Sequence, residues 1–178
     1  MSYEEEIMAW RRKRETDLSK GVMIGDMLWS PVPESERKDL KLNFFPVNPE
    51  FKFNARLTLL EDKRERILTK ADGTPTDPFL ETGHVEFMYG HENIRLFIIY
   101  DVQTNGYYLG FRDSTCGVES YPNGRLLLIE EINKEDITLD FNKAFNFACA
   151  YNELLPCPIT PQENWLKFPV RAGEKKYH

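Results

Sequence analysis

Apolar and polar residues alternate along most of the chain beyond residue 50. The clearest stretch is Phe51–Leu59, FKFNARLTL, where every second residue is apolar and the residues between are Lys, Asn, Arg and Thr. A period of two is typical of a β-strand that buries one face. The same alternation returns in seven shorter segments, at residues 66–69, 85–89, 94–100, 107–111, 126–129, 137–141 and 166–170.

Turn-forming residues separate these segments. Asn105 and Gly106 predict a tight hairpin turn, and the motifs YPNG and NKED predict further reversals. Strands at hairpin spacing favour an antiparallel meander. We therefore expect a mostly β protein of about eight strands, closed into a barrel or folded into a sandwich. Because Pro169 lacks a backbone N–H, it places the last strand at an edge or a bulge.

The start of the chain follows a helical period instead. Ser2 and Glu5 have the spacing of a capping box, and Ile7 and Trp10 recur roughly at helical spacing. We predict an N-terminal α-helix over residues 2–18. Ile7 and Trp10 are expected to pack this helix on apolar sheet surface.

The basic run Arg11–Arg14 within this helix is interpreted as a solvated face. Three prolines then punctuate residues 21–48, which predicts an irregular, partly exposed connector. Residues 49–178 would form the β domain, with a C-terminal belt that wraps across one end of the sheet. A chain of 178 residues, 41% of them hydrophobic, can bury one core, so we expect residues 1–178 to form a single domain.

Charge and composition narrow the class of partner. The chain has 23 basic and 29 acidic residues, and its net charge of −6 offers no basic excess for a nucleic-acid backbone. No apolar run reaches the ~20 residues that a membrane span requires, and the charged start MSYEEEIMAWRRKRE is unlike a secretory signal. We therefore expect a cytoplasmic protein without nucleic-acid or membrane partners, in an oligomeric state that stays open.

A polar run follows the strand predicted at residues 137–141. Between Asp140 and Asn164 the chain carries many side-chain amides, two cysteines and three prolines. Such side chains can satisfy the backbone groups of a long segment that has no ladder partner. They can also line a ligand pocket at the mouth of a barrel. Both interpretations predict an ordered belt, but only the second predicts a solvent-reachable pocket beside it.

Strand parity places Asp140 and Asn142 opposite the apolar residues of their strand, so both should point outward near its end. The first functional hypothesis is therefore a binding module without chemistry of its own, which takes a small polar ligand at this end of the barrel. The residues assigned to the ligand site are Asp113, Arg125, Asp140, Asn142, Asn146, Glu163 and Asn164.

The loop that precedes Arg125 is rich in charge. Glu119 is expected to pair with Arg112 or Arg125 across the hairpin, and Gly117 and Gly124 are expected to adopt positive φ in its turns. Exposed ion pairs stabilise a fold by only ~0 to 1 kcal/mol, so structure alone is a weak reason for so charged a turn. This favours a functional site.

Two other classes of function stay open. A hydrolase could use the carboxylates of Asp140 and Glu163, or Cys157 with a histidine, if these groups surround space for a substrate. A protein-interaction domain could use the proline-rich connector Leu28–Pro33 or an open sheet edge.

The cysteines form an odd set of three, and reduced thiols are the default in the expected compartment. Cys149 and Cys157 lack C-x-x-C spacing, and the histidines that could complete a zinc site, His84 and His91, belong to distant strands. We therefore expect no metal and no cofactor, with Cys149 and Cys157 as buried, inert thiols. A disulfide between them suits their spacing but is disfavoured by a reducing compartment. Cys116 is expected to be the most exposed thiol.

Four motifs carry a resemblance to a known family. They are FRDSTCGVESYPNGR at 111–125, LDFNKAFNFACAY at 139–151, CPITPQENWL at 157–166 and AGEK at 172–175. In these the chain resembles the uncharacterised prokaryotic proteins of domain-of-unknown-function family 1684. Longer members carry an extra β-rich segment after the opening helix, where this chain has only residues 21–41, so it is similar to a short member. The resemblance implies positions for a site but no particular reaction.

Overall fold

The computed structural model describes all 178 residues. Its helices are α1 (Tyr3–Lys20) and α2 (Glu34–Arg37), with 3₁₀ turns η1 (Pro49–Phe51), η2 (Phe141–Lys143), η3 (Ala148–Ala150) and η4 (Gln162–Asn164). Its strands are β1 (Val22–Ile24), β2 (Met27–Trp29), β3 (Lys52–Arg66), β4 (Phe79–Tyr89), β5 (Glu92–Asp101), β6 (Gly106–Phe111), β7 (Arg125–Leu128), β8 (Asp136–Asp140) and β9 (Phe145–Asn146). Neither helix is long and apolar enough to cross a bilayer.

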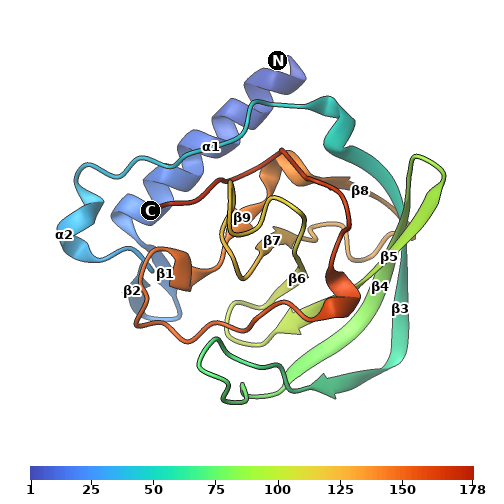
Figure 1. Cartoon of the computed structure of the whole chain (residues 1–178). Coiled ribbons are helices and arrows are strands. Elements are labelled where there is room, and N and C mark those ends of the chain that lie inside the picture. The colour runs from blue at the N-terminus through green and yellow to red at the C-terminus, as the bar shows by residue number, and fades with distance from the viewer.

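Seven strands form one antiparallel sheet in the order β8-β3-β4-β5-β6-β7-β9. This sheet curls into a half-barrel, while β1 and β2 pair in a small separate sheet (Figure 1). The predicted mostly β meander, with an N-terminal helix and a wrapping C-terminal segment, is confirmed. Curling requires bulges in the long strands β3 and β4. Gly83 lies at one bulge, where a Cβ atom would stand 2.2 Å from the Thr58 carbonyl oxygen, so only glycine fits.

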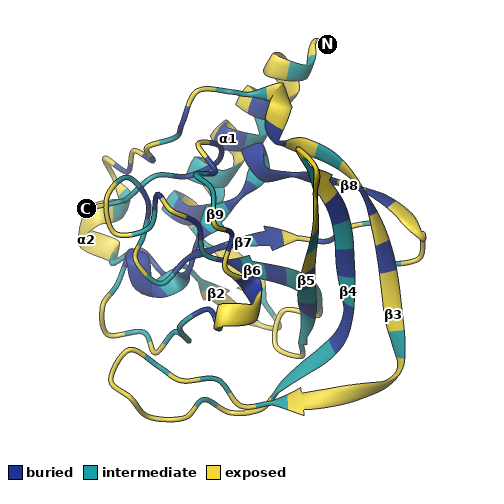
Figure 2. Cartoon of the chain, turned by 45° about the vertical axis from the view of Figure 1, so that its right-hand side comes forward, coloured by how far each residue is buried: buried dark blue, intermediate teal, exposed yellow.

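The core lies on the concave face of the half-barrel. Ala55 and Leu57 are buried while their neighbours along β3 are exposed, and Figure 2 shows this alternation as coloured bands. Phe141 closes the core, with its ring centroid 5.8 Å from that of Phe53 and 4.9 Å from that of Phe111. The two-residue period of the sequence thus corresponds to one buried and one exposed face of the sheet.

Helix α1 begins at the predicted capping box. The Ser2 hydroxyl accepts a hydrogen bond from the Glu5 backbone N–H, and the Glu5 carboxylate accepts one from the Ser2 N–H. Ile7 is fully buried, whereas Trp10 is half-buried and meets Phe44 of the connector edge-on, at 6.4 Å between ring centroids. The connector therefore supplies part of the surface against which the helix packs.

The interpretation of Arg11–Arg14 as a solvated face is wrong for two of its four residues. Arg11 is buried and donates to the Phe45 carbonyl oxygen at 2.9 Å. The Arg14 side chain is only 16% exposed, and its guanidinium lies 4.3 Å from the ring centroid of Phe145. Both arginines can turn inward because each guanidinium finds an oxygen acceptor and an aromatic face there.

The connector between α1 and β3 is more ordered than predicted. It contains the β1–β2 hairpin and the short helix α2. It also contributes to a second, smaller apolar cluster that joins it to α1 and to the C-terminal half of the chain. The buried members of this cluster are Leu18, Val32, Leu40, Leu42 and Tyr151.

The strand predicted at residues 166–170 does not form. The Leu166 N–H donates to the Arg112 carbonyl oxygen, whereas the Val170 N–H donates to the carboxylate of Asp113. A proline between them has no N–H to offer. Single bonds to different partners therefore replace a strand ladder in this segment.

Two strand ends also differ from prediction. Residues 66–69 are not a separate strand, because Arg66 ends β3 and Thr69 makes only an isolated bridge to Pro75. Phe141 begins η2 instead of continuing β8.

The half-barrel stays open between β7 and β8. β9 pairs only with Arg125 and Leu126 at the start of β7, and β8 pairs only with β3. The rest of β7 therefore faces β8 across a gap without ladder bonds, which we call the seam. Residues of helix α1 line this gap together with residues of β7 and β8. The polar groups around this gap form the candidate site.

Candidate functional site

Asp113 and Arg125 form an ion pair within the protein interior. The Arg125 Nη2 atom lies 3.3 Å from Asp113 Oδ1, and both side chains are 0% exposed. Arg125 also donates to three backbone carbonyls of residues 165–178, which we call the C-terminal strap. Burial lowers the pKa of Arg125, and the charge of Asp113 opposes this shift. The ion pair therefore anchors the strap to the sheet.

The Asp113 carboxylate has several further donors. It accepts the Val170 N–H at 2.6 Å and the Thr115 hydroxyl at 2.9 Å. Thr115 is itself buried and within 2.8 Å of the Ser120 hydroxyl. These bonds occupy the acceptor positions that a ligand of Asp113 would need.

The charged loop before Arg125 is paired differently from the prediction. Glu119 pairs with Arg171 of the strap at 2.9 Å, not with Arg112 or Arg125. The Arg112 guanidinium instead lies 4.4 Å from the ring centroid of Trp165. The reason is that the strap crosses this loop and brings closer partners to both side chains. Two glycines of the loop take the predicted positive φ, 85° and 108°.

Asp140 and Asn142 meet beneath α1. Asp140 accepts the backbone N–H of Asn142 at 3.1 Å and the hydroxyl of Tyr3 at 2.9 Å. Asn142 is fully buried and exchanges two hydrogen bonds, each 2.8 Å, with the backbone of Asn48. Burial and the bond to Asp140 raise the pKa of Tyr3. The pair thus connects the helix and the connector to the end of β8.

Asn146 belongs to a third group, centred on Glu174. The buried carboxylate of Glu174 accepts the Asn146 backbone N–H at 2.6 Å and the Tyr151 hydroxyl at 2.6 Å. Arg14 of α1 supplies the compensating charge, 3.3 Å away. Burial, together with the negative charge of Glu174, raises the pKa of Tyr151. This group joins α1, β9 and the strap.

Asn164 substitutes for missing ladder bonds in the sheet. Its side-chain oxygen accepts the Phe97 N–H at 3.0 Å, and its amide nitrogen donates to the carbonyls of Phe97 and Gly110 at 2.9 and 2.8 Å. β5 and β6 pair only from Ile99 onward, so the amide bridges the part where these strands separate. Its neighbour Glu163 is 59% exposed and pairs with Arg66 at 2.5 Å.

The structure thus distributes the seven predicted ligand residues over four places. None of the four main cavities is lined by more than one of them. Asp140 lines the cavity at the seam, and Asn146 lines a neighbouring cavity. The other five lie under the strap, under α1 or along the belt.

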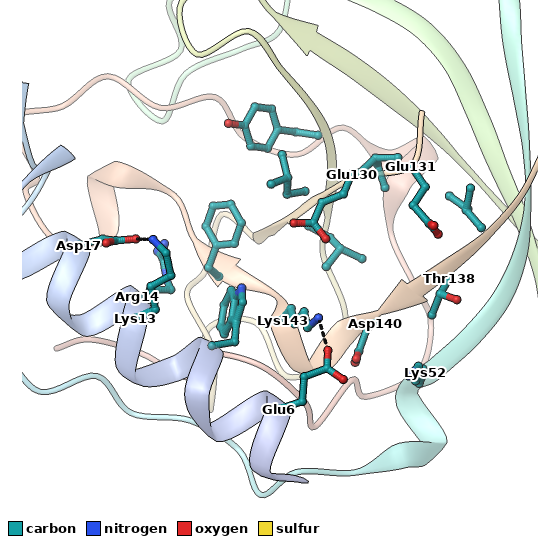
Figure 3. Close-up of a pocket in the computed structure, with 17 residues that line it drawn as sticks. Glu6, Lys13, Arg14, Asp17, Lys52, Glu130, Glu131, Thr138, Asp140 and Lys143 are labelled. Atoms are coloured by element: carbon teal, nitrogen blue, oxygen red, sulfur yellow. Dashed lines mark hydrogen bonds and ion pairs between the residues drawn. The ribbon is translucent and has the colours of Figure 1, made fainter. Parts of the chain in front are cut away.

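The cavity at the seam, which we call the seam cleft, has a volume of about 540 Å³. α1 forms one wall, and β7, β8 and the chain after each of them form the other (Figure 3). Its lining contains charges of both signs. The charged residues are Glu6, Lys13, Arg14, Asp17, Lys52, Glu130, Glu131, Asp140 and Lys143.

These charges are only partly neutralised within the cleft. Glu6 and Lys143 form an ion pair of 2.8 Å, and the bond to Lys143 lowers the pKa of Glu6. Lys52 has no carboxylate within ion-pairing distance, and its ammonium lies 4.7 Å from the ring centroid of Tyr3. Glu130 has no basic partner either, and in Figure 3 it lies across the cleft from Glu6 and Lys143. The cleft can therefore offer a cation on one side and an anion on the other.

A second, more apolar cavity of about 630 Å³ adjoins the seam cleft. The two share Arg14, Asp17, Tyr108 and Phe145 in their linings. The Arg14 guanidinium over the Phe145 ring forms part of this common wall. Apolar side chains of β1 and β2 contribute to the lining of the second cavity.

Sequence reasoning missed most residues of the seam cleft. The contact between Glu6 and Lys143 joins positions 137 residues apart, so no local motif reports it. Likewise, no local pattern reports the contact of Tyr3 with Asp140 or that of Glu174 with Arg14. The AGEK motif, which contains Glu174, was the one available signal. The role of Glu174 depends on Arg14 and Tyr151, which only the fold brings next to it.

The groups considered for a hydrolase lie apart. Asp140 is bonded to Tyr3 and Asn142, whereas Glu163 pairs with Arg66 at the far end of the belt. The two carboxylates considered for a hydrolase therefore lie in different parts of the structure. Cys157 lines two cavities, and neither is lined by a histidine.

Comparisons with known proteins agree with this fold. The model of the family described as protein of unknown function (DUF1684) matches residues 40–175. The solution NMR structure of an uncharacterised protein from Haloarcula marismortui is similar, with a TM-score of 0.71 and 28% sequence identity, over 97% of this chain and 94% of that chain. No curated protein matches the chain. With a family match over most of its length, this chain belongs to the DUF1684 family.

Proposed function

We propose that the protein is a binding module for a small polar metabolite, which occupies the seam cleft. The observation that carries this proposal is the cleft itself, about 540 Å³ at the point where the half-barrel fails to close. Cavities of this size accommodate metabolites, and an unclosed seam gives access from solvent. The site therefore differs from the one expected at the barrel mouth, although Asp140 belongs to both.

The arrangement of charges favours a ligand that carries both signs. A carboxylate or phosphate group would be placed beside Lys52 and Lys143, and an amino group beside Glu130. Because Lys52 and Glu130 have no ion-pair partner, a ligand can bind to them without breaking an existing ion pair. The net charge of −6 makes nucleic acid a poor occupant.

Binding without chemistry is supported by the state of the buried acid. Asp140 is 8% exposed, and its carboxylate accepts hydrogen bonds from Tyr3 and Asn142. A general base needs a free acceptor that reaches the substrate. The cytoplasm is the proposed location, because the three cysteines are free thiols and reduced thiols persist there.

The test is binding followed by NMR on labelled protein. α-Amino acids, dicarboxylates, polyamines and sugar phosphates would be titrated separately, and amide shifts mapped on the structure. We expect a zwitterionic compound to shift signals around Lys52, Lys143 and Glu130. Lys52→Gln and Glu130→Gln should each weaken its binding about tenfold, the effect of losing ~1.4 kcal/mol.

Two exposed positions outside the cleft serve as matched controls. Lys41→Gln and Glu61→Gln make the same charge changes on residues that do not line it. The proposal fails if no compound class shifts cleft signals, or if the control variants weaken binding as much as Lys52→Gln and Glu130→Gln.

A second candidate function is self-association through the β1–β2 hairpin. Met23, Met27 and Leu28 are each about 60% exposed there, which is unusual for three large apolar side chains on one hairpin. Sedimentation of the protein over a range of concentrations tests this. A dimer that dissociates in Met23→Ser supports it, and a monomer at every concentration refutes it.

A further inference from the structure

Cys149 and Cys157 are brought together by the fold of the belt. Cys149 lies in η3, and the chain then turns back through the bonds of Tyr151 to Ala148 and of Leu155 to Asn152. As a result, the backbone N–H of Cys149 donates to the sulfur of Cys157 at 3.1 Å. Two thiols eight positions apart in sequence thus share one site.

Tyr121 adds a third group to this site. Its hydroxyl donates to the Cys149 sulfur at 3.3 Å, and Asn123 in turn contacts the Tyr121 hydroxyl at 3.5 Å. Tyr121 comes from the loop before β7, so its position does not depend on the belt. A hydroxyl aimed at a sulfur is an arrangement that stabilises a thiolate.

The thiols are reachable from solvent. A cavity of about 290 Å³ is lined by Cys149, Cys157, Tyr121 and Asn123, with Lys70 and Glu153 nearby in the lining. Cys157 is partly exposed, contrary to the expectation that both would be buried, whereas Cys149 is buried. This cavity shares no lining residue with the seam cleft, so the two sites can be tested independently.

The electrostatics agree with the geometry. The pKa of Cys149 is lowered to about 7, chiefly by the hydrogen bond from the Cys157 thiol and also by the Tyr121 hydroxyl, while burial opposes both. A substantial thiolate fraction is therefore present at neutral pH. The proton that remains is retained by Cys157, whose pKa is raised.

We propose that Cys149 and Cys157 form a dithiol site that reduces small disulfides by thiol–disulfide exchange. The Cys149 thiolate attacks one sulfur of the substrate, so the substrate S–S bond breaks, a mixed disulfide forms and one thiolate leaves and takes up a proton. Cys157 then loses its proton to water and attacks the Cys149 sulfur, which releases the second substrate thiol. The protein dithiol is oxidised by two electrons to a Cys149–Cys157 disulfide, and the substrate is reduced to two thiols.

The expected rate follows from two opposing effects. At pH 7, a fall in pKa from 9.0 to about 7 raises the thiolate fraction roughly 50-fold. A more acidic thiol is also a weaker nucleophile, which reduces the rate roughly eightfold for this shift. Folded Cys149 should therefore react roughly sixfold faster than an ordinary thiol of the unfolded chain.

The experiment uses the full chain with Cys116→Ser, which removes the third thiol, and 2-hydroxyethyl disulfide as the probe. Intact mass spectrometry should show the loss of two hydrogen atoms and no adduct. With Cys157→Ala added, one mercaptoethanol adduct should remain on Cys149. The rate of the parent protein should rise with pH around a midpoint near 7, and Cys157→Ala should raise that midpoint because it removes the thiol that donates to Cys149. Dithiothreitol should restore the dithiol in the parent protein.

The variant Tyr121→Phe distinguishes a chemical role of the Tyr121 hydroxyl at the Cys149 thiolate from a structural role of the Tyr121 ring. It should move the midpoint of the pH–rate profile upward, because it removes a donor to the thiolate while retaining the ring. The proposal is overturned if the parent protein accumulates adducts on both cysteines without an internal disulfide. It is also overturned if the folded protein reacts no faster at pH 7 than the same protein in urea.

Discussion

The C-terminal strap and the seam cleft are built from the same kinds of charged residue but differ in how those residues are partnered. Under the strap, Asp113, Arg125 and Glu174 are almost wholly buried, and each makes several hydrogen bonds. In the cleft, Lys52 and Glu130 are exposed and have no ion-pair partner. Charged side chains that are buried and hold several internal hydrogen bonds thus have a structural role, whereas accessible charges without an ion-pair partner are available for a ligand.

The physical reason is the cost of removing charge from water. A buried ion survives only if its partners replace the lost hydration, so its bonds cannot be exchanged for those of a ligand without a large penalty. An exposed ion keeps its water and can exchange it at little cost. The strap should therefore determine stability, and the cleft should determine binding.

The largest predicted effect is for Asp113→Ala. This change leaves the buried Arg125 guanidinium without its counter-ion and the Val170 N–H without an acceptor, so unfolding free energy should fall by about 3–5 kcal/mol. Urea denaturation measures it. The control Glu163→Ala breaks an exposed ion pair with Arg66 and should cost less than about 1 kcal/mol. Equal losses for both variants would remove the distinction between buried and exposed pairs.

Substitution of two glycines, Gly173 in the strap and Gly117 in the loop before β7, tests how closely the strap is packed. Gly173 has φ 76°, and a Cβ atom there would stand 2.6 Å from the Ala144 carbonyl oxygen. Gly117 has a similar φ of 85° but open space around it. Gly117→Ala should cost about 1–2 kcal/mol from backbone conformation alone, and Gly173→Ala about 1–3 kcal/mol more. Similar thermal denaturation midpoints for the two variants would show that the strap can shift to accommodate the added methyl group at little cost.

Ionisation of the Tyr151 hydroxyl should make the stability of the protein fall at alkaline pH. The folded pKa of Tyr151 is raised above the ordinary value of 10.0, so both states are protonated below pH 10 and its contribution to stability is complete there. Above pH 10 the unfolded state loses the proton first, and stability falls by about 1.4 kcal/mol per pH unit until the folded pKa is reached. Tyr151→Phe should lower stability at pH 7 by about 1–3 kcal/mol and flatten this alkaline decline.

A decline of unchanged slope in Tyr151→Phe would assign the alkaline sensitivity to other groups. Urea denaturation at a series of pH values gives both quantities from the same samples.

The smallest effect on stability is expected in the seam cleft. Lys143→Gln breaks the pair with Glu6, in which the two side chains are 26% and 49% exposed, so unfolding free energy should change by less than about 1 kcal/mol. NMR titration should nevertheless show weaker binding of a zwitterionic ligand. A large loss of stability here would mean that Lys143 is a structural residue like those under the strap.

Part of the candidate site was predictable from local sequence. The amide-rich belt, its order and its replacement of ladder bonds were expected, and Asn164 does bridge β5 and β6 with its side chain. The ligand role assigned to Asp113 and Arg125 rested on the weakness of surface ion pairs. Their pair is buried, so that argument did not apply to it.

The sequence by itself determined three features: the strands with their alternating buried and exposed residues, the capped N-terminal helix and the polar belt. Each of these depends on residues within a few positions of one another. Only the tertiary structure decided that the sheet stops short of closure between β7 and β8. It alone also decided which charges would be buried together and that two cysteines would share a cavity. These outcomes depend on contacts such as Tyr3 with Asp140, 137 residues apart, and no local pattern encodes a distance of that kind.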